Sequence, residues 1–253
     1  MVQEEVATPT GRRARNRLAR HREYLRTALR IATEDGLDAL TMQRLADEVD
    51  AAVGTVYTYF PSKGALVAEV QREAIERLTA SYLLLRPDVE AKVADEAPSV
   101  AAVTHLVAFG RFWIDSFDSY PREQRLLQQL MSEAHRTVED SEVGRVVPAA
   151  LRLLDLARER FEVASQVGAL SPAEPMERTV TLAASLSGVL QLGKLGEFDP
   201  DVLDGPRLAT RFLDDLLAGW GARPDERSAG HAFVDAIARR HRLARALPEG
   251  DDT

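Results

Sequence analysis

Four hydroxyl-bearing side chains and one lysine gather in a short stretch of this 253-residue chain. They are Thr55, Tyr57, Thr58, Tyr59 and Lys63. Hydroxyl groups donate and accept hydrogen bonds and an ammonium group only donates, so this set suits contact with phosphate oxygens and base edges. Val53, Val56 and Phe60 alternate with these residues at helical spacing. The pattern predicts a short helix with one polar and one apolar face.

A second short helix is predicted directly before this one. Its apolar positions recur at i, i+3, i+4 and i+7 and are Met42, Leu45, Ala46 and Val49. Thr41 is placed to cap the helix with its hydroxyl, and Asp50 and Ala51 interrupt the pattern. Two short helices joined by a few residues are typical of a helix-turn-helix, whose second helix enters the major groove of DNA. An inert three-helix structural cap is the alternative that composition leaves open.

Longer helices on either side are expected to hold this pair. The first is predicted over 16–35, with an apolar stripe made of Leu18, Leu25, Ala28, Leu29 and Ala32. Gly36 would end it by accepting a positive φ. Ser62 is expected to cap a further helix that Pro87 ends, and the polar stretch 87–98 is expected to be a loop.

The remainder of the chain is predicted to be helical as well. The expected helices lie at about 99–119, 121–137, 146–167, 171–195, 206–219 and 228–246, with a loop over 200–206. The sequence contains no convincing run of alternating apolar residues of the kind that predicts a strand, and no repeat of 20–50 residues. The predicted fold class is therefore all-α.

Charge is distributed unevenly along the chain. The formal net charge is −8, yet eight arginines face a single acid, Glu23, between Gly11 and Ile31. They are Arg12, Arg13, Arg15, Arg17, Arg20, Arg22, Arg26 and Arg30. A basic end on an acidic body favours a small DNA-reading module attached to a larger domain, and a solvated basic tail is the alternative.

Several classes of protein are disfavoured by composition. No stretch of eighteen apolar residues is present, and the N-terminus has no apolar segment typical of a secretory signal. Cysteine is absent, which excludes disulfides, thiolate nucleophiles and cysteine-based zinc sites. These features fit a cytoplasmic protein without a membrane partner.

Residues 39–66, ALTMQRLADEVDAAVGTVYTYFPSKGAL, resemble the DNA-binding signature of the tetracycline-repressor (TetR) family of bacterial regulators. The resemblance covers about residues 18–70. It implies a flexible basic tail over 1–15, a helix-turn-helix domain over 16–63, and a helical ligand-sensing and dimerisation domain over 64–253. It also implies a repressor that binds a palindromic double-stranded operator as a homodimer and is released by a small, apolar effector.

The resemblance further implies roles for particular residues. Contacts to DNA are expected from Thr41, Gln43, Gly54, Thr55, Tyr57, Thr58, Tyr59 and Lys63. Thr58 stands at a variable position, where base choice would be set, and Gly54 would allow the backbone to approach DNA closely or simply begin a tight helix. The arginines from Arg12 to Arg22 would form an arm along the DNA backbone or in the minor groove, with a plain charged tail as the alternative.

The chain departs from the family's pattern at three positions. Asp50 stands where glycine is usual in the turn, although aspartate tolerates left-handed geometry better than most residues. Ala52 replaces the usual serine cap of the recognition helix, a loss of about 1 kcal/mol. Tyr59 stands where histidine is common. These departures leave the operator sequence open.

Two helices near the C-terminus are candidates for the dimer interface that the family commonly forms. One has a face of small residues, namely Ala183, Ala184, Ser185, Ser187 and Gly188. The other has a broad apolar stripe, namely Leu208, Phe212, Leu216 and Trp220. Small residues allow close approach of a neighbouring helix, and twofold symmetry would match a palindromic site. An internal helix pair is the alternative.

An aromatic group is the candidate ligand-binding site. Its members are Phe109, Phe112, Trp113, Phe117 and Tyr120, with Met131 nearby. They could line an apolar pocket, but an aromatic stripe at helical spacing is also typical of a packed core.

Enzymatic and metal sites are not predicted, and no cofactor is expected. The stretch from Gly188 to Lys194 resembles a phosphate-binding loop, but Leu195 stands at its Ser/Thr position. His105 and His135 lack partners at ligand spacing, so neither predicts a metal site. A helical protein-interaction module with vestigial DNA binding is the remaining alternative.

Overall fold

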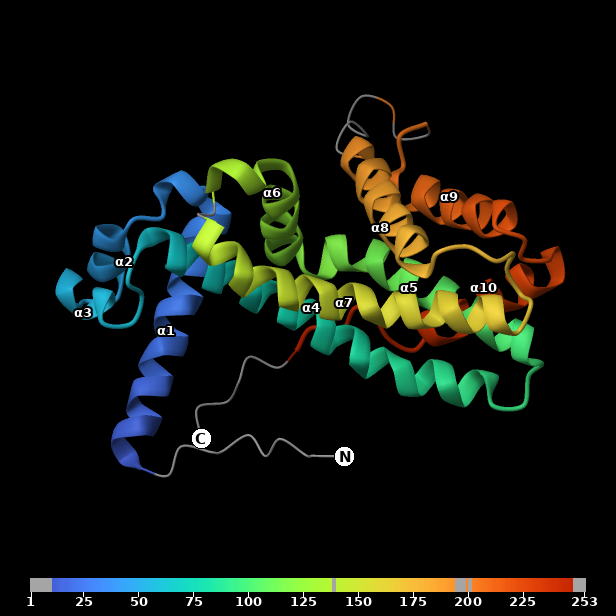
Figure 1. Ribbon diagram of the computed structural model, residues 1–253, viewed down its shortest axis with the longest axis horizontal. Helices are drawn as coiled ribbons and strands as arrows, with labels where there is room; N and C mark the ends of the chain where they lie inside the picture. Colours follow the sequence, from blue (N-terminus) through green and yellow to red (C-terminus); the bar gives the residue numbers. More distant parts are fainter. Residues whose placement is uncertain (1–10, 138–139, 194–198, 200–201, 248–253) are drawn as a thin grey trace. The chain divides into compact units, whose positions relative to one another are not determined.

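The computed structural model describes residues 11–137, 140–193, 199 and 202–247, with 130–137 and 140–143 described by their backbone alone (Figure 1). The described chain divides into two compact units. Unit 1 is drawn from Met1–Glu73 and Arg125–Val146, and unit 2 from Ala74–Gln124 and Val147–Thr253. Helices account for every regular element within these residues, which confirms the all-α fold class.

Unit 1 is built on one long helix and two short ones. The helix α1 covers Arg12–Glu34 and the short 3-10 turn η1 covers Leu37–Ala39. They are followed by α2, Met42–Glu48, and α3, Val53–Tyr57. The helix α4, Lys63–Val93, begins in unit 1 and continues into unit 2. The unit also holds most of α6, Pro121–Thr137, and the start of α7, Asp140–Gln166.

The core of unit 1 gathers on the second half of α1. Its largest fully buried side chains include Tyr24, Ile31, Leu40, Leu45 and Leu66. The prediction that Leu18 belongs to the apolar stripe is wrong, because this side chain is 39% exposed. The buried positions of α1 begin at Tyr24, so the first turns of the helix have no core to cover. The helix also begins at Arg12, four residues before the predicted start at 16.

Unit 2 holds the remaining helices. They are the rest of α4 and α7, with α5, Pro98–Ser119, α8, Pro175–Leu192, α9, Gly205–Gly219, and α10, Pro224–Ala238. In its core the ring of Tyr82 on α4 packs edge-on against Phe109 and tilted against Phe112, with ring centroids 5.1 and 5.2 Å apart. Helix α10 packs along α5, and α8 pairs with α9. The last helix therefore completes the core.

Two helices that end or lie in unit 2 have other bounds than those predicted. Pro87 was expected to end its helix and 87–98 to form a loop, yet α4 continues to Val93. Val89 and Val93 are buried, so their burial extends the apolar stripe and outweighs the hydrogen bond that proline cannot donate. The final helix was expected over 228–246 but covers Pro224–Ala238. It begins earlier because the Arg223 N–H donates to the Glu226 carboxylate at 2.9 Å, which caps the first turn.

The segment after α10 is tied to unit 2 by hydrogen bonds. The Ser81 hydroxyl donates to the Arg245 carbonyl at 2.8 Å, and the Ala244 N–H donates to the Asp115 carboxylate at 2.8 Å. Leu243 and Ala244 are buried. These contacts hold residues 239–247 against the core of unit 2, although this segment is not helical.

A buried histidine in the core makes stability depend on pH. Burial, with a smaller contribution from Arg160, lowers the pKa of His105 from 6.5 to about 4. Between these two pKa values the unfolded chain binds a proton at His105 that the folded chain does not bind. The free energy of unfolding therefore falls as pH decreases through that window. We expect the urea midpoint to fall between pH 6.5 and 4.5, and His105→Gln to remove part of this slope. The same slope in both proteins would contradict the assignment.

Candidate nucleic-acid interface

Ion pairs fix α2 across the end of α1. Arg30 on α1 pairs with Glu48 on α2, and Arg44 on α2 pairs with Asp35 just after α1. Arg44 also lies 3.8 Å from Glu48, which joins the two pairs. The side chains are about a third to nearly half exposed, so each pair adds little stability. Together they link α2 to the C-terminal end of α1.

The turn between α2 and α3 has left-handed geometry at Asp50. Its φ is 49°, which confirms that aspartate adopts the conformation usually given to glycine there. The Ala51 N–H donates to the Ala46 carbonyl at 2.9 Å and closes the end of α2. Gly36 has φ 91°, so the predicted glycine stop after α1 is confirmed too.

Polar side chains line the exposed start of α2. The Thr41 hydroxyl accepts a hydrogen bond from the Arg44 N–H at 3.1 Å, so the predicted cap is confirmed. Gln43 is exposed and donates to the Asp47 carboxylate at 2.8 Å. Both side chains are exposed to solvent.

Removing the Thr41 cap is expected to destabilise the domain. Thr41→Ala leaves an amide of the first turn without its acceptor, which costs about 1 kcal/mol of unfolding free energy. Urea unfolding followed by circular dichroism measures the loss. Thr41→Ser keeps the acceptor oxygen and should retain most of the stability, so an equal loss in both variants would contradict the capping role.

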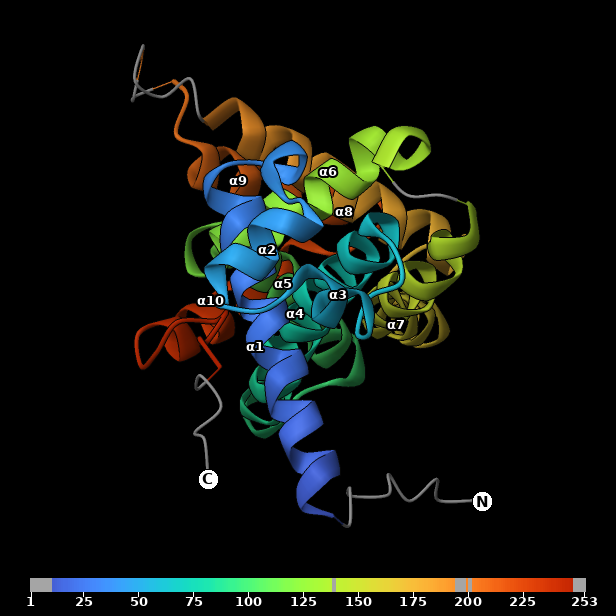
Figure 2. The ribbon, with the colours of Figure 1, turned by 90° about the vertical axis from the view of Figure 1, so that its left-hand side faces the viewer.

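Helix α3 packs against unit 1 through its apolar side and leaves its polar side exposed. Val56 is fully buried, whereas Tyr57 is 49% exposed. Figure 2 shows α3 next to α2, against which it packs. Thr58 is exposed and its hydroxyl donates to the Thr55 carbonyl at 2.6 Å. Ala52 gives the helix no side-chain cap. A Cβ at Gly54 would meet no atom within 4 Å, so packing inside the protein does not require glycine there.

Tyr59 differs from the other predicted contacts because its ring packs against α1. The ring lies edge-on to Tyr24 with centroids 5.1 Å apart, and the guanidinium of Arg17 lies 5.8 Å from its centroid. His21 stacks on Phe60 at 5.1 Å. A hollow of about 360 Å³ is lined by Ala14, Arg17, Leu18, His21 and Tyr59. Sequence reasoning missed this junction, although Arg17, His21 and Tyr24 share one helix face.

Lys63 stands exposed at the first turn of α4. Its ammonium group lies 3.4 Å from the Asp38 carbonyl, and Ser62 caps the helix by accepting from the Ala65 N–H at 3.0 Å.

A lysine on a phosphate releases one condensed counterion. Lys63→Ala should therefore weaken DNA binding evenly across sequences and lower the slope of log K against log salt by about one. Lys92→Ala, at the other end of α4, should leave the slope unchanged, and a matching change in both would contradict the assignment.

The exposed half of α1 carries an excess of positive charge. Seven of its arginines make no ion pair with any residue that the structure describes. They are Arg12, Arg13, Arg15, Arg17, Arg20, Arg22 and Arg26. Those from Arg12 to Arg20 are fully on the surface. The arm predicted from the sequence is therefore helical within the described residues.

The predicted ligand-binding aromatics lie elsewhere, in unit 2. Phe109, Phe112 and Trp113 are buried, and the Trp113 ring N–H donates to the Ser187 hydroxyl at 3.1 Å. Phe117 is half-buried, and the side chain of Met131 lies outside the described residues. Within the described chain no group of His, Asp and Glu is placed to hold a metal ion. No helix there is long and apolar enough to cross a membrane.

Comparisons with known proteins match this domain. Residues 25–70 match the model for bacterial regulatory proteins of the tetR family. The transcriptional repressor KstR of Mycolicibacterium smegmatis is 39% identical over 61 residues, which are 24% of this chain and 30% of that protein. KstR of Rhodococcus jostii is 37% identical over 59 residues, which are 23% and 28% of the two proteins. The match thus spans less than a third of these curated relatives.

Solved structures resemble more of the chain. A bacterial regulatory protein in the tetR family from Rhodococcus RHA1 has a TM-score of 0.56 at 15% identity, over 80% of this chain and 97% of that one. A protein of unknown function from Rhodococcus sp. RHA1 has a TM-score of 0.61 at 18% identity, over 87% and 99%. AibR, solved with isovaleryl coenzyme A and operator DNA, has a TM-score of 0.51 at 20% identity, over 78% and 98%. These likenesses establish the fold.

The fold defines a class of protein in which a helix-turn-helix domain is followed by further helices. Over residues 25–70 the chain matches the tetR family of bacterial regulatory proteins.

Proposed function

We propose that this protein is a transcriptional repressor that binds a palindromic operator as a homodimer and is released by a small effector. The observation that carries the proposal is the exposed, uncharged face of α3 beside an arginine-rich helix. Tyr57 is exposed without a core role, and the seven arginines of α1 that make no ion pair within the described residues would supply a sequence-independent attraction to phosphates. KstR, a repressor, is similar to 61 residues of this chain. We assign no enzymatic activity.

The proposed contacts divide into two kinds. Thr55, Tyr57 and Thr58 on and after α3 would read base edges, with Gly54 allowing close approach of the backbone. Contacts to phosphates are assigned to Thr41, Gln43, Tyr59 and Lys63. Because Tyr59 is braced by Tyr24 and Arg17, its position depends on α1 rather than on α3 alone.

The proposed dimer interface lies on α8 and α9. Ala184 and Gly188 are exposed on α8, between the exposed Val180 and Leu192. On α9, Leu208, Phe212 and Leu216 are half-buried in the single chain. A row of small and apolar exposed residues allows a second copy to approach closely, and burial of this row would stabilise the pair. Two copies related by a twofold axis would present two recognition helices.

The proposed effector site is the aromatic core of unit 2. Phe109 and Phe112 are fully buried against Tyr82, so an apolar effector would have to displace packed rings to enter. The effector would then favour a conformation in which the dimer no longer fits two half-sites. AibR has been solved with isovaleryl coenzyme A, which is consistent with ligand binding by this fold.

Selection of binding sites from random-sequence DNA tests the proposal without knowledge of the operator. We expect enrichment of a palindrome whose half-sites lie about one or two helical turns apart. Fluorescence anisotropy on the selected DNA should show selective binding, relative to scrambled DNA, that weakens steeply with salt. No enriched sequence, or equal affinity for selected and scrambled DNA, would leave the protein-interaction module as the better account.

A further inference from the structure

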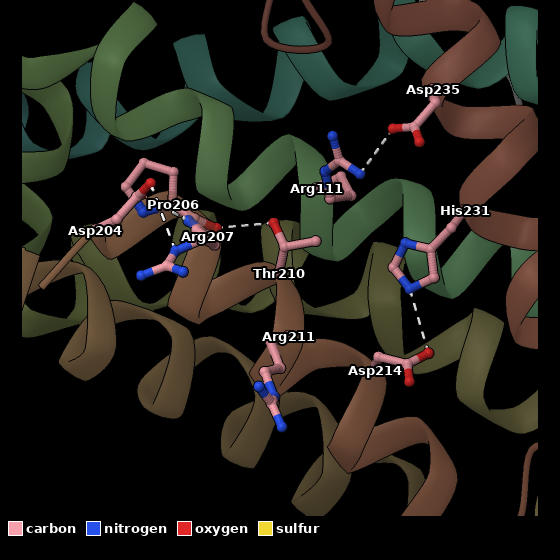
Figure 3. A pocket seen from close by; sticks show the side chains of 9 residues that line it. All are labelled: Arg111, Asp204, Pro206, Arg207, Thr210, Arg211, Asp214, His231 and Asp235. Carbon is pink, nitrogen blue, oxygen red and sulfur yellow. Dashed lines mark hydrogen bonds and ion pairs between the residues drawn. The ribbon is translucent and has the colours of Figure 1, made fainter. Parts of the chain in front are cut away.

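A polar groove on unit 2 is distinct from the aromatic core and from the DNA-binding domain. It has a volume of about 600 Å³ and lies among α5, α9 and α10 (Figure 3). Its lining residues are Arg111, Asp204, Pro206, Arg207, Thr210, Arg211, Asp214, His231 and Asp235. The volume falls within the range of small-molecule sites, but the lining is charged where such sites are usually apolar. Six of the nine lining residues are charged, so a charged ligand would meet charged partners here, while the stems of the side chains supply apolar surface.

The three carboxylates of the groove already have cationic partners. Asp235 pairs with Arg111 at 2.9 Å, and Asp204 lies 3.8 Å from Arg207. Asp214 pairs with Arg227 beside the groove at 3.0 Å. Their negative charge is thus compensated within the protein, so the carboxylates do not make the groove a site for a cation.

Arg211 is the charge that remains. In the described part of the chain its guanidinium makes no ion pair or hydrogen bond, and Figure 3 shows it set apart from the carboxylates. It lies one helical turn from Arg207 on α9, so the two guanidinium groups lie on the same side of the helix. The lining holds three arginines and three aspartates, and Arg227 from outside it pairs with Asp214, so Arg211 is the lining arginine that has no carboxylate partner in the described chain.

His231 adds a polar atom without a satisfied hydrogen bond. Its Nε2 is buried and lies 3.4 Å from the Asp214 carboxylate, too far for a good hydrogen bond. Burial lowers the pKa of His231, although Asp214 opposes the shift. Burial thus disfavours the charged form of the ring, so His231 adds little positive charge to the groove.

We infer that this groove binds a small anion with a carboxylate or phosphate group. Arg211 would supply the main contact, because a guanidinium donates two parallel hydrogen bonds to either group. Arg207, one turn earlier, would supply a second contact to a ligand with more than one anionic group. An anion bound there would give the Arg211 guanidinium the partner that it lacks within the described residues.

Calorimetric titration of the full chain with inorganic phosphate and, separately, with citrate tests the inference at constant ionic strength. We expect saturable binding of at least one probe, and the stronger probe distinguishes phosphate from carboxylate recognition. Arg211→Gln should weaken that binding by about tenfold or more, because a charge-assisted pair is lost. Arg211→Lys keeps the charge without the fork and should fall between the two.

The matched control is Arg240→Gln, since Arg240 is an exposed arginine of unit 2 outside the groove. Unchanged far-ultraviolet circular dichroism establishes that each variant is folded. Absence of saturable binding to both probes, or equal weakening in Arg211→Gln and Arg240→Gln, would overturn the inference. Because no DNA is present, either result leaves the proposed repressor function to its own test.

Discussion

Replacing Tyr57 by alanine should weaken binding to the selected operator by roughly 10- to 100-fold, while binding to scrambled DNA changes little. A lost contact to a base edge costs about 1–3 kcal/mol of discrimination, which corresponds to that range. Tyr57 is 49% exposed, so its ring contributes little to the core and its removal should not unfold the domain. Fluorescence anisotropy at fixed salt measures both affinities.

The control for this variant is Leu83→Ala, which truncates a similarly exposed large side chain in unit 2. It should leave both affinities unchanged. If Tyr57→Ala weakened selective and non-selective binding equally, Tyr57 would be a phosphate contact and base reading would have to come from Thr55 or Thr58.

A methyl group added at Gly193 should destabilise the protein by roughly 1–3 kcal/mol, the usual cost of overpacking. Gly193 ends α8 and Gly205 begins α9, and the two backbones touch. A Cβ at Gly193 would lie 2.8 Å from the Gly205 Cα and 3.2 Å from its nitrogen. Backbone atoms cannot rotate away as a side chain can, so the helix pair would have to separate. Urea unfolding of Gly193→Ala measures the cost.

Gly144→Ala is the matched control, because a Cβ there would meet no atom within 4 Å. It replaces glycine within a helix and should raise stability by up to about 1 kcal/mol. Equal stability of Gly193→Ala and the natural protein would mean that α8 and α9 do not touch at these glycines.

Local signals in the sequence predicted the helix-turn-helix well. Thr41, Gly36 and Asp50 each act through their own backbone or the next turn, so residue type alone indicates what they do. The helix end predicted at Pro87 was wrong because the effect of proline on a helix is local. The burial of Val89 and Val93, which continues the helix, depends on helices distant in the sequence.

The missed features depend on long-range packing. Tyr59 has a residue type suited to DNA, yet only the fold places Tyr24 and Arg17 against its ring. The groove around Arg211 joins residues from three helices, between Arg111 and Asp235, and no spacing along the chain links them. The absence of a partner for Arg211 likewise becomes visible only when every nearby carboxylate has been placed.

The exposed first turns of α1 have a thermodynamic consequence for DNA binding. No side chain caps the helix at Gly11, and no acidic residue occupies its first turn. Arg13 and Arg17 repeat the same charge one turn apart, which opposes helix formation in the free protein. Phosphates would remove that repulsion, so bound DNA would stabilise turns that are already helical in the free protein. These turns would then resist local unfolding more strongly in the complex than in the free protein.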